Sequence, residues 1–180
     1  MNNDGLVDYI FIIKGTDKNQ IITDQYSRKL DRNRRGIIVL LSKNDKYELA
    51  VRNYDCFSSE NEDGGVYFPP ELWLEIKNGN LCVHYGHGRY GYWEYTFRFQ
   101  NSDFELIGYD QGDHRGPYIE QETSINFLTK KKLIRENTYQ PKNEDDIKEV
   151  FKETWSDITI ESLLKLSEIT DFDELDMSKY

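Results

Sequence analysis

Alanine occurs only once in the 180 residues of this chain, at position 50. Because alanine is the strongest helix former, its near absence argues against a helical bundle. The sequence contains no run of about 18 apolar residues, so it predicts no membrane span. The chain begins MNNDGLVD, without a basic segment followed by an apolar stretch, and we therefore expect no signal peptide here.

Cysteine and net positive charge are also scarce. The only cysteines, Cys56 and Cys82, would pair in an oxidising compartment or stay free in a reducing one. We favour two unbridged thiols, because nothing else in the sequence indicates a disulfide-stapled scaffold. The formal net charge of −10 repels nucleic acid and anionic lipid and suits a basic partner or cations.

Recognisable catalytic motifs are missing from the sequence. There is no G-x-S-x-G motif, and neither cysteine lies in a catalytic signature. The glycine-rich segment GHGRYG at residues 86–91 is not followed by a helix start or a Lys-Ser/Thr pair, as a phosphate-binding loop requires. We therefore favour a non-catalytic protein over an enzyme.

Aromatic residues are abundant, at 14% of the chain, and they favour pleated strands. Between Trp93 and Gln100 every odd position is aromatic and every even position is polar. This period of two places the rings on one face of a strand. The run that returns after Asn101-Ser102 alternates too, so we predict a hairpin whose rings from Trp93 to Phe99 point into a dry interior.

Further runs predict more strands. Asn78-Gly79 is the strongest short hairpin signal in the chain, because both central residues of a type I′ turn need a positive φ. We therefore pair residues 71–77 with residues 80–85. Uninterrupted apolar runs predict two buried strands, at residues 9–13 and 37–41. Residues 124–128 and 133–136 predict another hairpin.

Polar segments predict loops at residues 15–36, 53–70 and 111–118. The first contains a basic cluster that would either grip phosphate or belong to a solvated loop. Because the whole chain is acidic, we favour the solvated loop. The cluster consists of Arg28, Lys29, Arg32, Arg34 and Arg35.

The last part of the chain leaves two alternatives open. Residues 147–157 fit a helix, with start signals at 143–146, and they also fit a strand. Residues from about 171 onward are acidic, and we expect them to fray. The sequence as a whole predicts a mainly β fold: a single antiparallel domain of successive hairpins over residues 1–180, forming a curved sheet or a sandwich, with at most one short C-terminal helix near 145–157.

Oxygen-bearing groups crowd the first eight residues. Asn2, Asp4 and Asp8 offer side-chain oxygens and Leu6 a carbonyl, around a glycine that permits a sharp turn. This pattern, followed at once by an apolar strand, resembles the calcium loop of FG-GAP/VCBS-type repeats, which implies a Ca²⁺ ion held by these four residues. The first acid of the family pattern would precede the first residue, so either the site is defective or the natural chain is longer. The alternative is a polar turn leading into a strand.

A second resemblance covers most of residues 4–170. The segments FELIGYD at 104–110 and TSINFLTKKKLI at 123–134, together with the N-terminal DGxxD strand, resemble a group of bacterial envelope proteins without a known activity. This resemblance implies a location in the bacterial cell envelope or outside the cell, with the natural N-terminus removed. A cytoplasmic location is the alternative. It implies no mechanism.

The outward face of the central hairpin is the candidate binding surface. Tyr90, Tyr92 and Trp73 would lie opposite the core, near His84 and Arg98. Exposed aromatics with polar neighbours are typical of surfaces that recognise sugars or proteins, although another layer of structure would make the same residues core. We predict a non-catalytic module that binds a protein or a glycan. An immunity or inhibitor protein fits this class, since an acidic domain suits a basic toxin or enzyme.

The histidines give an alternative function. His84, His87 and His114, with Asp113, would serve a metal-dependent hydrolase if their rings converge. On a strand, residues three apart point to opposite faces, so the spacing is poor unless Gly86 bends the chain. The competing interpretation is that these are surface histidines beside aromatic residues.

Overall fold

The computed structural model describes residues 1–2, 4–61, 71–141, 146 and 148–180. The protein is mainly β: 57% of the described residues lie in strands, the strands form antiparallel sheets, and the predicted fold class is confirmed. Where the sequence predicts one domain, the described residues divide into two compact units.

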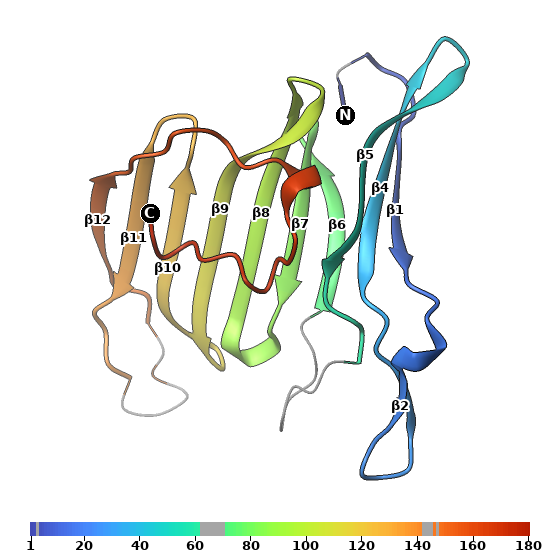
Figure 1. Cartoon of the computed structure of the whole chain (residues 1–180). Helices are drawn as coiled ribbons and strands as arrows, with labels where there is room; N and C mark the ends of the chain where they lie inside the picture. Colours follow the sequence, from blue (N-terminus) through green and yellow to red (C-terminus); the bar gives the residue numbers. More distant parts are fainter. Residues whose placement is uncertain (3, 62–70, 142–145, 147) are drawn as a thin grey trace. The chain divides into compact units, whose positions relative to one another are not determined.

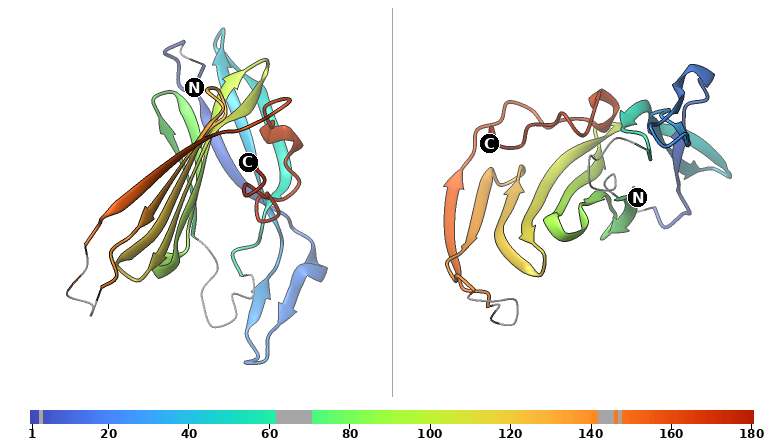
Figure 2. Two further views of the ribbon diagram at one scale, coloured as in Figure 1. Left: turned by 90° about the vertical axis from the view of Figure 1, so that its left-hand side faces the viewer. Right: turned by 90° about the horizontal axis from the view of Figure 1, so that it is seen from below.

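The second unit is built on one seven-stranded antiparallel sheet, in the order β12-β11-β10-β9-β8-β7-β6 (Figure 1). It comprises the described residues within Pro70–Arg98, Leu106–Leu163 and Met177–Tyr180. Every strand lies beside its neighbour in the sequence, and the strands fan out as in a twisted sheet (Figure 2). The strands are β6 (Glu71–Lys77), β7 (Asn80–Gly86), β8 (Gly91–Gln100), β9 (Asp103–Arg115), β10 (Tyr118–Asn126), β11 (Lys131–Asn137) and β12 (Phe151–Asp157).

Two-residue turns account for this simple order. Asn78 and Gly79 join β6 to β7 with φ angles of +50° and +78°. Asn101 and Ser102 join β8 to β9 with φ angles of +51° and +61°. Residues in this left-handed region match the twist of the two strands that they connect. Both hairpins predicted around these turns are confirmed.

One face of this sheet, the core face, carries the buried apolar side chains. The alternation predicted for β8 is confirmed at its centre, where Tyr95 and Phe97 are 1% and 0% exposed. Trp93 and Phe99, at the two ends of the run, are only half-buried. Neighbouring strands add to the same face the buried residues Leu81, Val83, Tyr85, Tyr109 and Ile125.

The first unit contains a three-stranded sheet in the order β1-β4-β5 and a separate hairpin of β2 and β3. It comprises the described residues within Met1–Pro69, Phe99–Glu105 and Leu164–Asp176. The predicted buried strand at residues 37–41 is confirmed, because Ile37 and Val39 are fully buried on the central strand β4. The strands are β1 (Tyr9–Lys14), β2 (Ile21–Thr23), β3 (Lys29–Asp31), β4 (Arg35–Lys43) and β5 (Lys46–Phe57).

The prediction of a second buried strand at residues 9–13 is wrong. β1 lies at the edge of its sheet and pairs with β4 alone. Tyr9, Phe11 and Ile12 are 44%, 45% and 43% exposed. An uninterrupted apolar run predicts cover on both faces, but Tyr9 and Phe11, which alternation sends to the same face, have mainly each other and the half-exposed Tyr47 as ring neighbours.

The predicted loops are shorter than expected. Residues 15–36 include the 3-10 turn η1 (Lys18–Gln20) and the hairpin of β2 and β3. Arg35 is buried, and its Nε donates a hydrogen bond to the Ser58 carbonyl at 2.9 Å, so the basic cluster is not wholly a solvated loop. Of the loop predicted at 53–70, residues 53–57 belong to β5, and residues 62–70 lie outside the described residues.

The loop predicted at 111–118 is also shorter than expected. β9 continues to Arg115 and β10 begins at Tyr118, so only two residues form the turn, with Gly116 at a φ of +61°. Residues 111–115 are polar because they belong to a strand with polar groups on both faces. Polar composition alone therefore does not separate a loop from such a strand.

The strand interpretation is confirmed at residues 151–157, where the helical one is wrong, and residue 147 lies outside the described residues. β12 pairs with β11 in continuous register from Lys131↔Asp157 to Asn137↔Phe151. The free edge of β11 offers a full row of hydrogen-bonding groups, and the β-formers in this segment fit it. The predicted helix start at 143–146 lies outside the described residues except for Asp146.

The last ten residues are held rather than frayed. Within the first unit, Phe172 is buried, donates its backbone N–H to the Cys56 carbonyl at 3.0 Å, and stacks on Phe57. Within the second unit, Tyr180 packs against Phe127, with ring centroids 5.1 Å apart. Apolar residues spaced through this acidic segment therefore anchor it. The prediction of a frayed end is wrong because it relied on the acidic composition alone.

Both cysteines are free and buried, as favoured from the sequence. Burial raises the pKa of the Cys56 thiol to about 12 and also raises the pKa of Cys82. A thiol that stays protonated is a poor nucleophile. The raised pKa of both cysteines is therefore the opposite of the lowered pKa that a catalytic cysteine has.

Candidate binding face

The second face of the seven-stranded sheet is polar and carries aromatic rings. On β8 this face receives the even positions, Tyr92, Glu94 and Thr96, because side chains alternate along a strand. His84 of β7 lies opposite Glu94, and Trp73 of β6 lies opposite His84, so all three share one face. We call this side of the sheet the ring face.

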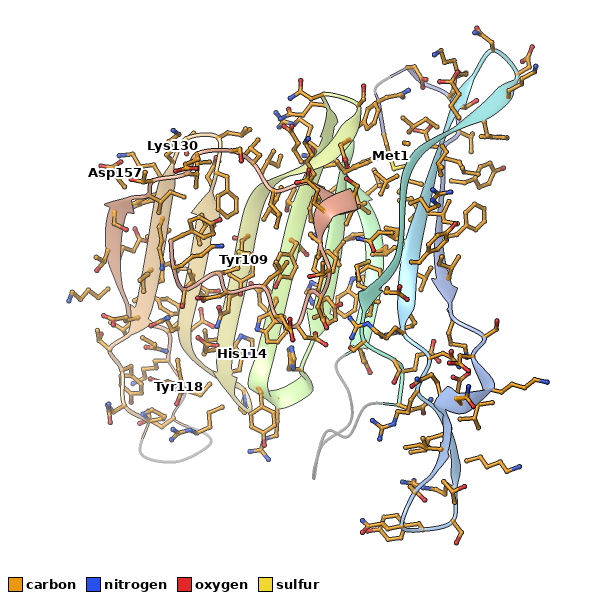
Figure 3. The ribbon with its side chains drawn as sticks, viewed as in Figure 1. Met1, Tyr109, His114, Tyr118, Lys130 and Asp157 are labelled. Carbon is orange, nitrogen blue, oxygen red and sulfur yellow. The ribbon has the colours of Figure 1, made fainter. Side chains whose placement is uncertain are left out.

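Four rings on the ring face contact one another across four consecutive strands. Trp73 and His84 stack with centroids 3.7 Å apart and planes 21° apart, and His84 stacks on Tyr92 at 5.3 Å and 13°. The Tyr92 ring then meets the edge of His114, on β9, at 6.0 Å (His114 is labelled in Figure 3). We call these four residues the aromatic row. Its ring contacts contribute about 0.5–1.5 kcal/mol each beyond burial.

Glycines on neighbouring strands make room for the row. A Cβ atom at Gly112 of β9 would lie 2.7 Å from the Tyr92 ring, and one at Gly86 of β7 would lie 3.1 Å from the Trp73 ring. Both distances are shorter than an ordinary contact between carbon atoms. Glycine at these two positions therefore allows the Tyr92 and Trp73 rings to pack directly against the neighbouring strands.

A charged pair supports the middle of the row. His84 Nδ1 and Glu94 Oε2 form a hydrogen bond of 3.1 Å, and Lys77 Nζ lies 3.1 Å from the same carboxylate. Lys77 also lies 2.6 Å from Glu75. The hydrogen bonds that Lys77 donates to Glu75 and to Glu94 raise its pKa, so this ammonium group stays charged. The His84 ring is therefore held by a ring on each side and by a carboxylate.

Beyond Tyr92 the ring face is hollowed, with a cavity volume of about 230 Å³. Strand pairing brings its walls together, because Ser124 of β10 lies opposite both Asp110 of β9 and Leu133 of β11. Ser124 Oγ donates a hydrogen bond of 2.6 Å to Asp110. We call this cavity the hollow, and its walls include Tyr92, Asp110, Glu122, Ser124, Leu133 and Arg135.

Arg135 closes one side of the hollow. Its guanidinium binds the Glu122 carboxylate, which lies opposite it on β10, and its Nε is 3.5 Å from Glu153 of β12. The same guanidinium lies over the Phe151 ring, 4.2 Å from the centroid. The hollow thus already contains one arginine held by carboxylates and an aromatic face, an arrangement that guanidinium groups favour.

The structure brings together three of the five residues predicted to bind. Trp73, His84 and Tyr92 form the aromatic row, and Trp73 remains 41% exposed. Tyr90 lies outside the strands, in the 3-10 turn η2 (Gly88–Tyr90), with the Arg89 guanidinium 5.8 Å from its ring centroid. Arg98 is on the ring face but six residues beyond Tyr92 along β8, about 20 Å away at the usual rise per residue.

The sequence prediction missed the hollow and the last ring of the row. From the sequence, no binding role is predicted for Asp110, Ser124, Glu122 or Arg135, and His114 is predicted either as a metal ligand or as a surface histidine beside aromatic residues. The signal was present in the predicted hairpins, because residues opposite one another on paired strands share a face. The register of β9 with β10 was hidden, since residues 111–118 looked like a loop.

The four residues predicted to bind calcium lie within the first unit, where hydrogen bonds join Asp4 to Asn2 and to Leu6. Asn2 Nδ2 donates to Asp4 Oδ2 at 2.8 Å, and the Leu6 backbone N–H donates to Asp4 Oδ1 at 2.8 Å. The Asp8 carboxylate accepts from the amino group of Met1 and from the Ser42 N–H at 3.0 Å. Asp8 is therefore already paired with a positive charge.

The calcium interpretation stays a prediction with a simple test. If the segment binds Ca²⁺, millimolar Ca²⁺ should raise the melting midpoint relative to chelator, because a ligand that binds only the folded state stabilises it. Asp4→Asn, which keeps the shape of the side chain, should remove that rise. An equal midpoint of the wild-type protein in Ca²⁺ and in chelator, measured by differential scanning fluorimetry, would dismiss the calcium site.

The histidines behind the hydrolase alternative have different surroundings. His84 stacks between Trp73 and Tyr92, whereas the His87 ring contacts Trp93, with centroids 4.2 Å apart. Among the described residues no group of three or more histidine, cysteine, aspartate or glutamate side chains is arranged to hold a metal ion. The hydrolase interpretation gains no geometric support from this part of the chain.

Comparisons with protein-family models, with curated proteins and with solved structures found no match to this chain. Within the described ranges, no helix has the length and apolar character needed to cross a membrane. The ring face and the resemblances carried by the sequence are therefore the features that indicate a function.

Proposed function

We propose that the protein is a non-catalytic binding module that recognises a macromolecular partner, a protein or a glycan, through the ring face. The observation that carries this proposal is the aromatic row, in which Trp73, His84, Tyr92 and His114 contact one another on the polar side of the sheet. A free protein rarely places large rings in contact on a polar face without a use for them. Aromatic anchors beside polar groups supply most of the energy in many recognition surfaces.

The polar groups around the row support recognition rather than general stickiness. Lys77 and Glu94 lie beside His84, and the hollow adds hydroxyl, carboxylate and guanidinium groups beside Tyr92. A surface of this composition offers apolar contact and directed hydrogen bonds together, which suits a specific partner. The two hydrogen-bonding halves, one at each side of Tyr92, would fix the orientation of that partner.

The proposal is tested with single alanine variants on glycan and peptide arrays. Trp73→Ala and Tyr92→Ala should each weaken the signals of the wild-type protein about tenfold or more, because truncating an aromatic anchor removes a large contact area. Tyr26→Ala is the matched control, since Tyr26 is a 70% exposed aromatic residue of the first unit. Circular dichroism of each variant establishes that it is folded.

Two outcomes would contradict the proposal. Wild-type signals that survive both Trp73→Ala and Tyr92→Ala would place binding elsewhere. Signals that fall equally with Tyr26→Ala would show that the arrays report non-specific adhesion of exposed rings and nothing about the ring face.

We further propose that the protein works in the bacterial cell envelope or outside the cell, as its sequence resemblance implies, and that it is of an immunity or inhibitor type. The support is the resemblance in residues 4–170 and the formal charge of −10, which favours association with a basic toxin or enzyme. Fractionation of cells that express the protein with its natural upstream sequence tests the location. Recovery in the cytoplasmic fraction alone would overturn it.

A further inference from the structure

The hollow contains a carboxylate that is short of partners. Ser124 Oγ donates one hydrogen bond to Asp110, and in the part of the chain that the structure describes no lysine or arginine lies within ion-pair distance of Asp110. The other carboxylates nearby are paired: Glu122 binds Arg135, and Glu94 lies 3.1 Å from Lys77. A half-buried carboxylate can accept more hydrogen bonds than Asp110 receives.

The surroundings of Asp110 disfavour its charge. Burial raises the pKa of Asp110, and the charges of Glu94 and Glu122 act in the same direction, while the Ser124 hydrogen bond and Lys77 oppose them. A carboxylate that water solvates poorly gains strongly from a cation placed beside it. The walls of the hollow carry two carboxylates and one guanidinium, which leaves one negative charge in excess.

The size and the lining of the hollow suit one cationic side chain. The Tyr92 ring forms one wall, and cations bind over aromatic faces. Burial raises the pKa of Tyr92, so its hydroxyl group stays protonated and adds no charge of its own. The cavity, at about 230 Å³, has room for one long side chain and not for a folded segment. Arg135 against Phe151 demonstrates the same kind of packing on the neighbouring strands.

We infer that the hollow receives an arginine side chain of a basic partner protein, with its guanidinium paired to Asp110 and lying against Tyr92. This inference rests on the proposed function, since it names the partner of the same face. Arginine fits better than a neutral sugar because the unmet requirement of the site is positive charge, and the acidic chain as a whole would steer a basic protein toward it.

The direct test is a titration with a short peptide. An acetylated and amidated Gly-Arg-Gly peptide is compared with the same peptide carrying citrulline, which keeps the shape of arginine and lacks its charge. Binding to the full-length protein is followed by NMR. We expect the arginine peptide to bind about tenfold more tightly than the citrulline peptide, because only the first satisfies the Asp110 carboxylate.

Asp110→Asn is the informative variant, and Asp157→Asn is its control. Both remove one negative charge, but Asp157 is exposed at the far end of β12, where its partner is Lys131. We expect Asp110→Asn to abolish the preference for arginine over citrulline and Asp157→Asn to keep it. This comparison separates the local pairing from the loss of overall charge.

The affinity for the arginine peptide should also depend on pH. Protonation of Asp110 removes the charge that attracts the guanidinium, and since burial raises the pKa of Asp110, the affinity should begin to fall at a higher pH than it would with an ordinary exposed aspartate. Asp110→Asn should flatten this dependence. The charged groups near Asp110 are Lys77 on β6, Glu94 on β8, Glu122 on β10 and Arg135 on β11, and the nearby hydroxyl groups are those of Tyr92 and Ser124.

Three outcomes would overturn the inference: equal binding of the arginine and citrulline peptides, an unchanged preference in Asp110→Asn, or a saccharide that binds the hollow and displaces the arginine peptide. In each case the proposed function is judged separately. It stands if Trp73→Ala and Tyr92→Ala still abolish the array signals, and it falls with the inference if they do not.

Discussion

Replacing Gly91 by alanine is expected to lower the free energy of unfolding by about 3 kcal/mol, the scale of a strained backbone combined with a steric clash. Gly91 has a φ of +114°, and a Cβ atom there would lie 1.7 Å from the carbonyl oxygen of Gly112. The obstacle is backbone of the neighbouring strand, which cannot rotate away as a side chain can. We therefore expect β8 and β9 to separate at this point, next to Tyr92.

Gly116→Ala is the matched control for this prediction. Gly116 also has a positive φ, +61°, but apart from its chain neighbours no atom of the described residues lies within 4 Å of the position that its Cβ would take. This variant should cost about 1 kcal/mol, the usual penalty for alanine in the left-handed region. Urea unfolding of both variants gives the comparison. Equal losses would mean that the close approach of β8 to β9 does not constrain the fold.

Phe97→Ala should destabilise the protein by about 3–5 kcal/mol, as expected for an aromatic residue removed from a packed core. Phe97 is fully buried at the centre of β8, opposite Leu81 of β7. For a chain of this length each kcal/mol lowers the melting temperature by about 2–4 °C, so the loss is easily measured by thermal unfolding.

Trp155→Ala provides the reference for an aromatic residue of the same sheet that is not in the core. Trp155 is 63% exposed on β12. Its removal should change the free energy of unfolding by less than about 1 kcal/mol, since little buried area is lost. If Trp155→Ala and Phe97→Ala cost the same, the assignment of the core face would be wrong.

The sequence predicted the central hairpins because their signals are local. A period of two in Trp93–Phe99 assigns faces, and Asn78-Gly79 assigns a turn, without reference to the rest of the chain. The prediction that β1 is a buried central strand is wrong because the number of strands beside an apolar run depends on distant segments. β12 was ambiguous for the same reason, since residues 151–157 became a strand through the edge that β11 offered.

The candidate site was predicted in part. That Trp73, His84 and Tyr92 share one face follows from alternation along the strands and from one hairpin register, and the sequence indicates both. The hollow needed the registers of β9, β10 and β11 together, and a polar strand that resembled a loop concealed the first of these. Tyr90 was misplaced because the alternation of β8 does not extend back through the turn at Gly88–Tyr90.

The order of strands in the seven-stranded sheet has a consequence for synthesis. Because β6 to β12 pair only with their neighbours in the chain, each new strand can join a partner that the ribosome has already released. The sheet does not have to wait for a distant segment before its hydrogen bonds form. Loop closure therefore costs little entropy at each step, and the growing edge is exposed only until the next strand arrives.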